Sequence, residues 1–196
     1  MTTVASADAI ASAFVEACLL DVTALTPGNV GLHAAGHGRG PLDSIRSAEA
    51  AAPAIVASAA SVGERIHRAV TATQRVVGAN TNLGIVLLAA PVVHAALQRR
   101  LPSATHLLSE RLNEVLASLT VADAERAFAA IRLARPGGLG SAARHDVHAP
   151  ARASLRDAMR EAAERDMIAR QYADGYAEVI ETGLGHLAGA RARGRD

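Results

Sequence analysis

Residues 61–97 read SVGERIHRAVTATQRVVGANTNLGIVLLAAPVVHAAL, and this stretch contains clear signals for where helices begin and end. Ser61 and Glu64 have the spacing of a capping box, which starts a helix. Gly78 is placed to end that helix, because glycine readily takes the left-handed conformation found after a last helical turn. After a short polar break, a second and more apolar helix begins near Gly84. The stretch therefore predicts two consecutive helices with a tight connection.

Similar helix signals recur along the rest of the chain, and no segment has the alternating pattern of a strand or an internal repeat. The other residues expected to start helices are Ser6, Asp43, Thr120 and Ser154. Pro53 must kink or restart the helix that follows Asp43. We therefore expect an all-α protein, a compact multi-helix bundle with functional loops at the helix breaks. Residues 1–196 are predicted to form a single helical domain, with 188–196 as a disordered tail.

The composition supports a helical core and excludes several classes of partner. Hydrophobic residues make up 50% of the chain and aromatic residues only 2%, which favours closely packed helices. The net charge of +1 gives no field that points to nucleic acid or to a membrane surface. The longest apolar stretch, from Gly84 to Leu97, is too short to cross a bilayer, and the single cysteine, Cys18, excludes an internal disulfide. We expect a cytoplasmic protein.

Three breaks between helices carry the most informative residues. Asparagine is scarce in this chain, and three of its four asparagines lie in two of the breaks. The breaks are Thr26-Pro27-Gly28-Asn29-Val30, Asn80-Thr81-Asn82-Leu83-Gly84 and Pro136-Gly137-Gly138-Leu139-Gly140. Free N–H groups at a helix start or in a glycine-rich loop can bind an anion. Each break taken alone fits an ordinary helix cap or stop better.

Two aspartates lie on faces that are otherwise apolar. Asp21 shares an arc of the first helix with Phe14, and Asp166 lies near the centre of the apolar face of a long helix near the C-terminal end. A buried carboxylate must be paired, hydrogen-bonded or bound to a metal. Asp166 therefore has two interpretations: a salt bridge to Arg170 one turn on, or a Mg²⁺–phosphate site shared with Asp21.

Segments around the breaks form four motifs in order, between about residue 8 and residue 185. They are Leu20-Asp21-Val22-Thr23-Ala24 before the first break; the second break leading into Ile85-Val86-Leu87-Leu88; Ala130-Ile131-Arg132-Leu133-Ala134-Arg135 before the third break, with Asp146-Val147 after it; and Ala163-Glu164-Arg165-Asp166-Met167-Ile168-Ala169-Arg170-Gln171-Tyr172. Each motif alone is weak, but the four in register resemble the triphosphoribosyl-dephospho-CoA synthase family. They are most similar to its archaeal and methylotroph branch.

The resemblance implies an all-α transferase that uses ATP. In the family's reaction, a hydroxyl of dephospho-CoA displaces adenine from ribose C1 of ATP, and the triphosphate is retained. By resemblance, Asp21 and Asp166 are the candidate catalytic residues, and Asp21, Asp146 and Asp166 are the candidate ligands of Mg²⁺. The candidate residues for binding ATP are Pro27, Gly28, Asn29, His33, Asn80, Thr81, Asn82, Gly84, Arg132, Gly137, Gly138, Gly140 and Arg170.

Two departures from the family's pattern leave the acceptor open. Thr26 stands where a lysine is usual before Pro27, and Asn82-Leu83 stands where the better-known branch has His-Lys. The leading prediction is a triphosphoribosyl transferase of cofactor biosynthesis, with ATP and dephospho-CoA or a related small molecule as its partners. The alternatives are the same chemistry on another acceptor, in tetrahydromethanopterin or methanofuran biosynthesis, or a helical module without catalytic activity. A homodimer is also compatible with the Ala-rich composition.

Overall fold

The computed structural model describes residues 5–23, 40–98 and 105–194, and it confirms the all-α prediction. Within these ranges the chain forms nine α-helices and one π-helix and no strand. They are α1 (Ala7–Thr23), α2 (Pro41–Ile55), α3 (Val62–Val77), α4 (Leu83–Leu97), α5 (Thr105–Ser118), α6 (Val121–Ala134), α7 (Leu155–Ala162), α8 (Met167–Asp174), the π-helix η1 (Glu178–Gly183) and α9 (Leu184–Ala192). α9 extends into the predicted tail. None of the described helices is long and apolar enough to cross a membrane.

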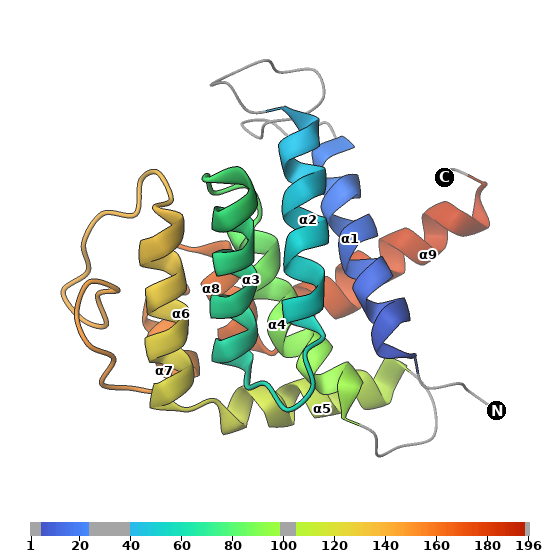
Figure 1. The fold of residues 1–196 in the computed structure, drawn as a ribbon. Helices are drawn as coiled ribbons and strands as arrows, with labels where there is room; N and C mark the ends of the chain where they lie inside the picture. Colours follow the sequence, from blue (N-terminus) through green and yellow to red (C-terminus); the bar gives the residue numbers. More distant parts are fainter. Residues whose placement is uncertain (1–4, 24–39, 99–104, 195–196) are drawn as a thin grey trace.

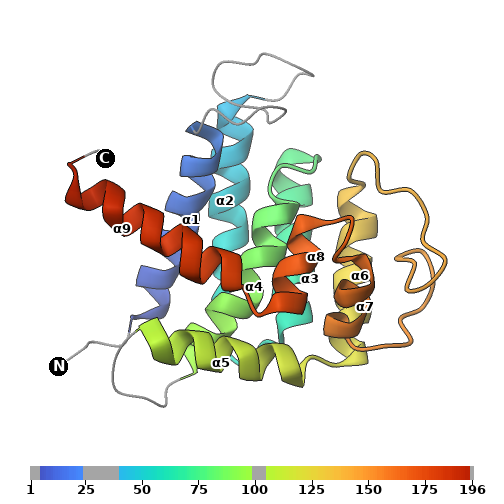
Figure 2. The same ribbon diagram turned by 180° about the vertical axis from the view of Figure 1, so that it is seen from behind.

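The helices form two layers that α5 closes at one end (Figures 1 and 2). α1, α2, α3 and α6 lie side by side in the first layer, and α4 and α8 lie behind them. α5 crosses the end at which α3 and α6 begin. The connection from α3 to α4 and the loop after α6 therefore both lie at the opposite end of the bundle, where α1 also ends.

Capping residues start and stop the central helices as predicted. Ser61 Oγ accepts from the Glu64 N–H at 3.3 Å, and Glu64 Oε2 accepts from the Ser61 N–H at 2.9 Å. Thr120 and Asp123 form the same reciprocal pair at the start of α6. Gly78 ends α3 in the left-handed conformation, with a φ of 69°. These local hydrogen bonds satisfy backbone groups that a helix end would otherwise leave without partners.

Two expected helix boundaries were wrong. The N-cap of α2 is Gly40 rather than Asp43, whose Oδ2 instead accepts from the Gly40 N–H at 3.3 Å. The long helix expected near the C-terminal end is divided into α7 and α8. The division occurs because Asp166 Oδ1 accepts from the Ala169 N–H at 2.8 Å, so that Asp166 starts a new helix instead of lying inside one.

Two buried tyrosines support α4 where Pro91 interrupts its hydrogen bonds. Pro91 has no N–H, so the carbonyl of Leu87 loses its usual partner within the helix. Tyr172 Oη donates to this carbonyl at 2.7 Å, and Tyr176 Oη donates to the carbonyl of Leu88 at 3.0 Å. Burial raises the pKa of both phenols, which keeps them protonated as donors. The pair fixes α8 and the turn after it to the middle of α4.

α3 and α6 approach each other closely near their N-termini. A Cβ at Gly63 would lie 2.5 Å from Cα of Asp123, so only glycine fits. The Gly63 N–H donates to Asp123 Oδ1 at 2.8 Å, while Asp123 Oδ2 accepts from the backbone N–H and the hydroxyl of Thr120. Burial alone would raise the pKa of Asp123, but donors from Gly63, Ser61 and Thr120 outweigh it and hold the pKa below its ordinary value. One carboxylate therefore joins the starts of two helices.

Protonation of His94 is expected to destabilise the fold. His94 on α4 is half-buried, and its Nδ1 accepts from Nε of the buried Arg65 at 3.4 Å. Burial and repulsion by Arg65 lower the pKa of His94 below 6.5. Between the ordinary pKa and the lowered one, only the unfolded state binds the proton, so stability is full above about pH 6.5 and falls as the pH decreases.

Urea midpoints measured from about pH 7.5 down to about pH 5 test this expectation. They should decrease with pH in the unmodified protein, and His94→Gln should make the decrease shallower. Equal slopes for the two proteins would contradict it.

Candidate functional site

A cavity of about 450 Å³ lies between α4, α6, α7, α8 and the loop after α6. The second break, at the start of α4, and the third break, after α6, both contribute to its wall. α8 contributes Asp166 at its N-terminus. Segments that lie far apart in the sequence, at the start of α4, after α6 and at the start of α8, meet at this cavity. The fold thus brings together three of the four motifs recognised in the sequence.

Some residues of the second break line the cavity, and others pack against neighbouring helices. Asn80, Leu83 and Gly84 line the cavity. Asn80 Oδ1 accepts from the Leu83 N–H at 3.2 Å and so caps α4. A Cβ at Gly84 would come within 3.2 Å of Cδ1 of Ile168, so glycine lets α8 pack closely on the start of α4. Asn80 and Gly84 therefore stay candidate site residues.

Thr81 and Asn82 do not line the cavity, contrary to what their place in the motif led us to expect. Thr81 Oγ1 donates to Ser47 Oγ of α2. Asn82 is 6% exposed, and its Oδ1 accepts from the Thr73 hydroxyl of α3 at 3.1 Å. Its Nδ2 is a buried donor without a partner. These two side chains join α4 to the first layer of helices.

The glycine-rich third break forms one wall of the cavity. Arg135 ends α6 with a φ of 47°, and residues 136–142 then follow the cavity wall. Gly138 and Gly140 have φ values of 74° and 63°, which are favourable for glycine and costly for other residues. Gly137 has no atom within 4 Å of an added Cβ, so its backbone is open to an approaching ligand. Gly137, Gly138 and Gly140 all line the cavity and stay candidate site residues.

The loop that follows is held against α6 by two charged side chains. Arg132 Nη1 donates to the Val147 carbonyl, and Arg132 Nη2 lies 3.6 Å from Glu125 Oε1. Glu125 Oε2 accepts from the Ala151 N–H at 2.8 Å. Arg132 does not line the cavity, so its predicted contact with phosphate is not supported. It instead anchors the loop that carries Asp146.

Asp146 lines the cavity and organises its own loop. Its Oδ2 accepts from the Ala142 N–H at 2.7 Å, and its Oδ1 accepts from the His148 N–H at 2.8 Å. These two backbone donors hold the pKa of Asp146 below its ordinary value. The side chain is therefore ionised at neutral pH and faces the cavity as a carboxylate.

Asp166 and Arg165 lie where α8 begins, at the edge of the cavity. Asp166 is exposed and caps α8, so it is not the buried centre of a helix face. The expected salt bridge to Arg170 is also absent from the ion pairs among the described residues; Arg170 Nε donates to the Ala163 carbonyl at 3.3 Å. Arg165 lines the cavity and Arg170 does not.

The environment of Asp21 differs from the apolar one predicted for it. Phe14 and Cys18 on its arc are buried, but Asp21 lies in the last turn of α1 and is exposed. Burial, with the charge of Asp21, raises the pKa of the Cys18 thiol to about 12, so this thiol is not a nucleophile at neutral pH. Asp21 is not part of the cavity lining. The predicted residues of the first break, Pro27, Gly28, Asn29 and His33, lie outside the described residues.

The remaining cavity wall is apolar. It is formed by side chains of α4, α6, α7 and α8, including Leu87, Phe128, Ile131, Met159 and Ile168. Their pattern is that of ordinary core positions, so they were not predicted as site residues. Arg165 and His145 also line the cavity and were not predicted; His145 has a φ of 52°. The one available signal was the place of Arg165 beside Asp166 in the fourth motif.

Asp146 and Asp166 are the carboxylates that could serve a metal ion in this cavity. Among the described residues there is no group of three or more His, Cys, Asp or Glu side chains placed to hold one. The two carboxylates therefore suit only a cation that takes most of its ligands from substrate and water. Mg²⁺ in nucleotide sites binds in this way.

Fold and cavity together define an all-α protein in which a glycine-rich loop, an arginine and two aspartates line a partly apolar cavity. The chain belongs to the CitG family of ATP:dephospho-CoA triphosphoribosyl transferases, because the model of that family matches residues 7–196. It is a transferase of cofactor biosynthesis that uses ATP and dephospho-CoA. No curated protein and no solved structure matches the chain significantly.

Proposed function

We propose that the cavity binds ATP and is the place where the triphosphoribosyl group is transferred. The observation that carries this proposal is the meeting of the second break, the third break and Asp166 at one cavity. These segments also carry the resemblance to the family. A common role in binding one substrate accounts for their convergence from α4, the loop after α6, and α8.

The polar side of the cavity would hold the triphosphate. The loop from Gly137 to Gly140 offers backbone N–H groups, and α4 begins at the same wall with the positive end of its dipole. In the better-known branch of the family a lysine occupies the position of Leu83, which is here a buried apolar residue. Arg165 lines the same cavity and would supply the cation that this position lacks.

Mg²⁺ would be held by Asp146 and Asp166 together with phosphate oxygens. When bound, the ion would neutralise charge on the triphosphate. The lowered pKa of Asp146 supports this role, because a metal ligand of this kind must be ionised. Asp21 stays a predicted metal ligand or base, from a position at the end of α1.

The apolar side of the cavity would bind the adenine, against side chains such as Leu87, Phe128 and Met159. In the transfer, the bond between ribose C1 and the adenine nitrogen breaks, and its electron pair leaves with the adenine. The acceptor hydroxyl oxygen bonds to C1 and gives up its proton. Asp166, at the edge of the cavity, would accept that proton or stabilise the positive charge that develops on the ribose.

Incubation of the protein with Mg-ATP and dephospho-CoA tests the proposal directly. We expect free adenine and an acceptor whose mass increases by the triphosphoribosyl group. Adenine release with a different acceptor only would keep the ATP site and change the acceptor. Calorimetry that detects no binding of ATP would overturn the proposal.

Arg165→Met is expected to weaken ATP binding about 10- to 100-fold, because a charge-assisted hydrogen bond contributes about 1.5–3 kcal/mol. Arg170→Met is the matched control: Arg170 is also an exposed arginine of this corner, but it does not line the cavity. The affinity of the Arg170→Met variant for ATP should stay near that of the unmodified protein. Equal losses in the two variants, measured by calorimetry, would argue against Arg165 as the phosphate ligand.

A further inference from the structure

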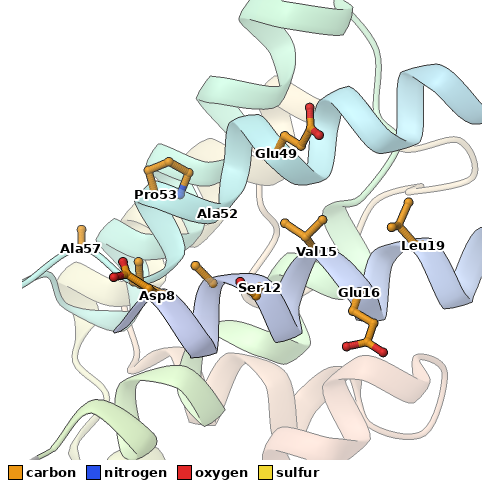
Figure 3. A pocket seen from close by; sticks show the side chains of 11 residues that line it. Asp8, Ser12, Val15, Glu16, Leu19, Glu49, Ala52, Pro53 and Ala57 are labelled. Carbon is orange, nitrogen blue, oxygen red and sulfur yellow. The ribbon is translucent and has the colours of Figure 1, made fainter. Parts of the chain in front are cut away.

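A second hollow, of about 700 Å³, lies between α1 and α2 (Figure 3). It is formed by residues 8–19 of α1 and residues 49–57 of α2 and the turn after it, and is called the α1–α2 groove below. Val15 and Leu19 lie between the two helices and form an apolar floor (Figure 3). The groove is also lined by Asp8, Glu16 and Glu49, and no Arg or His of the described part of the chain lines it. Such a surface repels a polyphosphate and suits an apolar segment with positive charge.

α9 is a segment of this kind. It continues η1 directly as one helix, and both views show it projecting from the bundle (Figures 1 and 2). Leu184 and Leu187 are 42% and 58% exposed, and their spacing of three residues places them on one face of the helix. Residues 184–193 contain histidine and arginine but no Asp or Glu. The helix therefore offers an exposed apolar face with positive charge nearby.

We infer that α9 of one copy of the chain docks into the α1–α2 groove of a second copy, and that the exchange is reciprocal. Leu184 and Leu187 cover the apolar floor, as in helix-in-groove recognition, where anchors recur every three or four residues. Arg193 pairs with one carboxylate of the acidic rim, where Glu16 and Glu49 point outward on opposite sides of the groove (Figure 3). The sizes also agree: nine helical residues span about 14 Å, and residues 8–19 of α1 span about 17 Å.

A second copy is the occupant that keeps the continuous helix of η1 and α9 intact. In the structure α9 continues directly from η1 as one helix, and its main contacts are not with α1 or α2. Seating it in the groove of its own chain would require this helix to break between Gly183 and Leu184. Reciprocal exchange between two copies needs no such change, and two identical contacts close the assembly as a two-fold dimer.

Size-exclusion chromatography with light scattering, on the full chain at about 1–100 µM, tests the inference. The unmodified protein is expected to be a dimer. Leu187→Asp, in α9, and the pair Glu16→Arg with Glu49→Arg, in the groove, should each give a monomer with unchanged helical content. Val121→Asp is the control, because Val121 is a 46% exposed apolar residue outside both surfaces, and this variant should stay dimeric.

Two further measurements identify the contact. Arg193→Glu should weaken the dimer, and its combination with Glu16→Arg and Glu49→Arg should restore it, because the charges are then exchanged. A mixture of the α9 variant with the groove variant should form heterodimers, since one of the two contacts stays intact. A monomeric unmodified protein, or a dimer that persists in both variants, would overturn the inference. Variants that change only the protease sensitivity of α9 in a monomer would also overturn it, in favour of docking within one chain.

Discussion

Asp166→Asn is expected to lower the rate of triphosphoribosyl transfer by at least about 100-fold, with little change in stability. The loss is expected because a carboxylate facing the developing charge, or the metal that neutralises it, typically contributes about 100- to 1,000-fold in rate. Stability should be nearly unchanged because Asp166 also caps α8, and asparagine caps a helix about as well as aspartate. The substitution thus separates the charge of residue 166 from its structural role.

The measurements are single-turnover release of adenine and thermal unfolding of the same samples. Asp157→Asn is the control, because Asp157 is an exposed carboxylate that pairs with Arg160 near the start of α7 and does not line the cavity. Asp166→Ala should lose both transfer and part of the stability, about 0.5–2 kcal/mol, through loss of the cap. Transfer at the original rate in Asp166→Asn would remove the carboxylate from the proposed chemistry.

Local signals predicted the helices of this chain well. The capping boxes at Ser61 and Thr120 and the stop at Gly78 all lie where the sequence placed them, because each depends on residues only a few positions apart. The same reasoning failed at Asp166. A carboxylate on an apolar arc and a carboxylate that caps a new helix have similar sequence surroundings. Only the packing of α7 and α8 decides between them.

The candidate site was partly predictable for the same reason. The predicted residues that line the cavity are Asn80, Gly84, Gly137, Gly138, Gly140, Asp146 and Asp166. They belong to helix breaks or caps, so their positions follow from where helices begin and end. Arg132, Arg170, Thr81 and Asn82 have the right chemistry but face elsewhere. The direction of a long side chain depends on the neighbouring helix, and a sequence without its fold does not reveal that neighbour.

Arg165 is the opposite case: it lines the cavity, but the sequence did not predict it as a site residue. Arginine is common in this chain and supplies all of its 20 Lys and Arg residues, so one more arginine beside Asp166 carried no special signal. Its significance comes from its place just before the start of α8, where it lines the cavity that Gly138 and Asp146 also line. Leu83 adds to this significance, because the better-known branch of the family has a lysine at this position and this chain has a buried leucine.

Gly63→Ala is expected to destabilise the fold by about 2–4 kcal/mol, which corresponds to a decrease of roughly 5–15 °C in the unfolding temperature. Alanine is intrinsically the better helix former, by about 1 kcal/mol. At this position, however, its Cβ would lie 2.5 Å from Cα and 2.6 Å from the carbonyl oxygen of Asp123, and backbone atoms cannot move aside as a flexible side chain can. α3 and α6 must therefore separate, and the hydrogen bond from Gly63 to Asp123 lengthens.

The matched control is Gly185→Ala in α9, where an added Cβ meets no atom within 4 Å and φ is not in the left-handed region. This variant should gain up to about 1 kcal/mol from helix propensity alone. Calorimetric or urea unfolding of the two variants gives the comparison, and a stable Gly63→Ala protein would disprove the close approach of α3 and α6.

Because α3 leads into the second break and α6 into the third, separation of these helices should also widen the cavity between the breaks. A destabilised Gly63→Ala protein should therefore bind ATP more weakly, even at temperatures where it is fully folded.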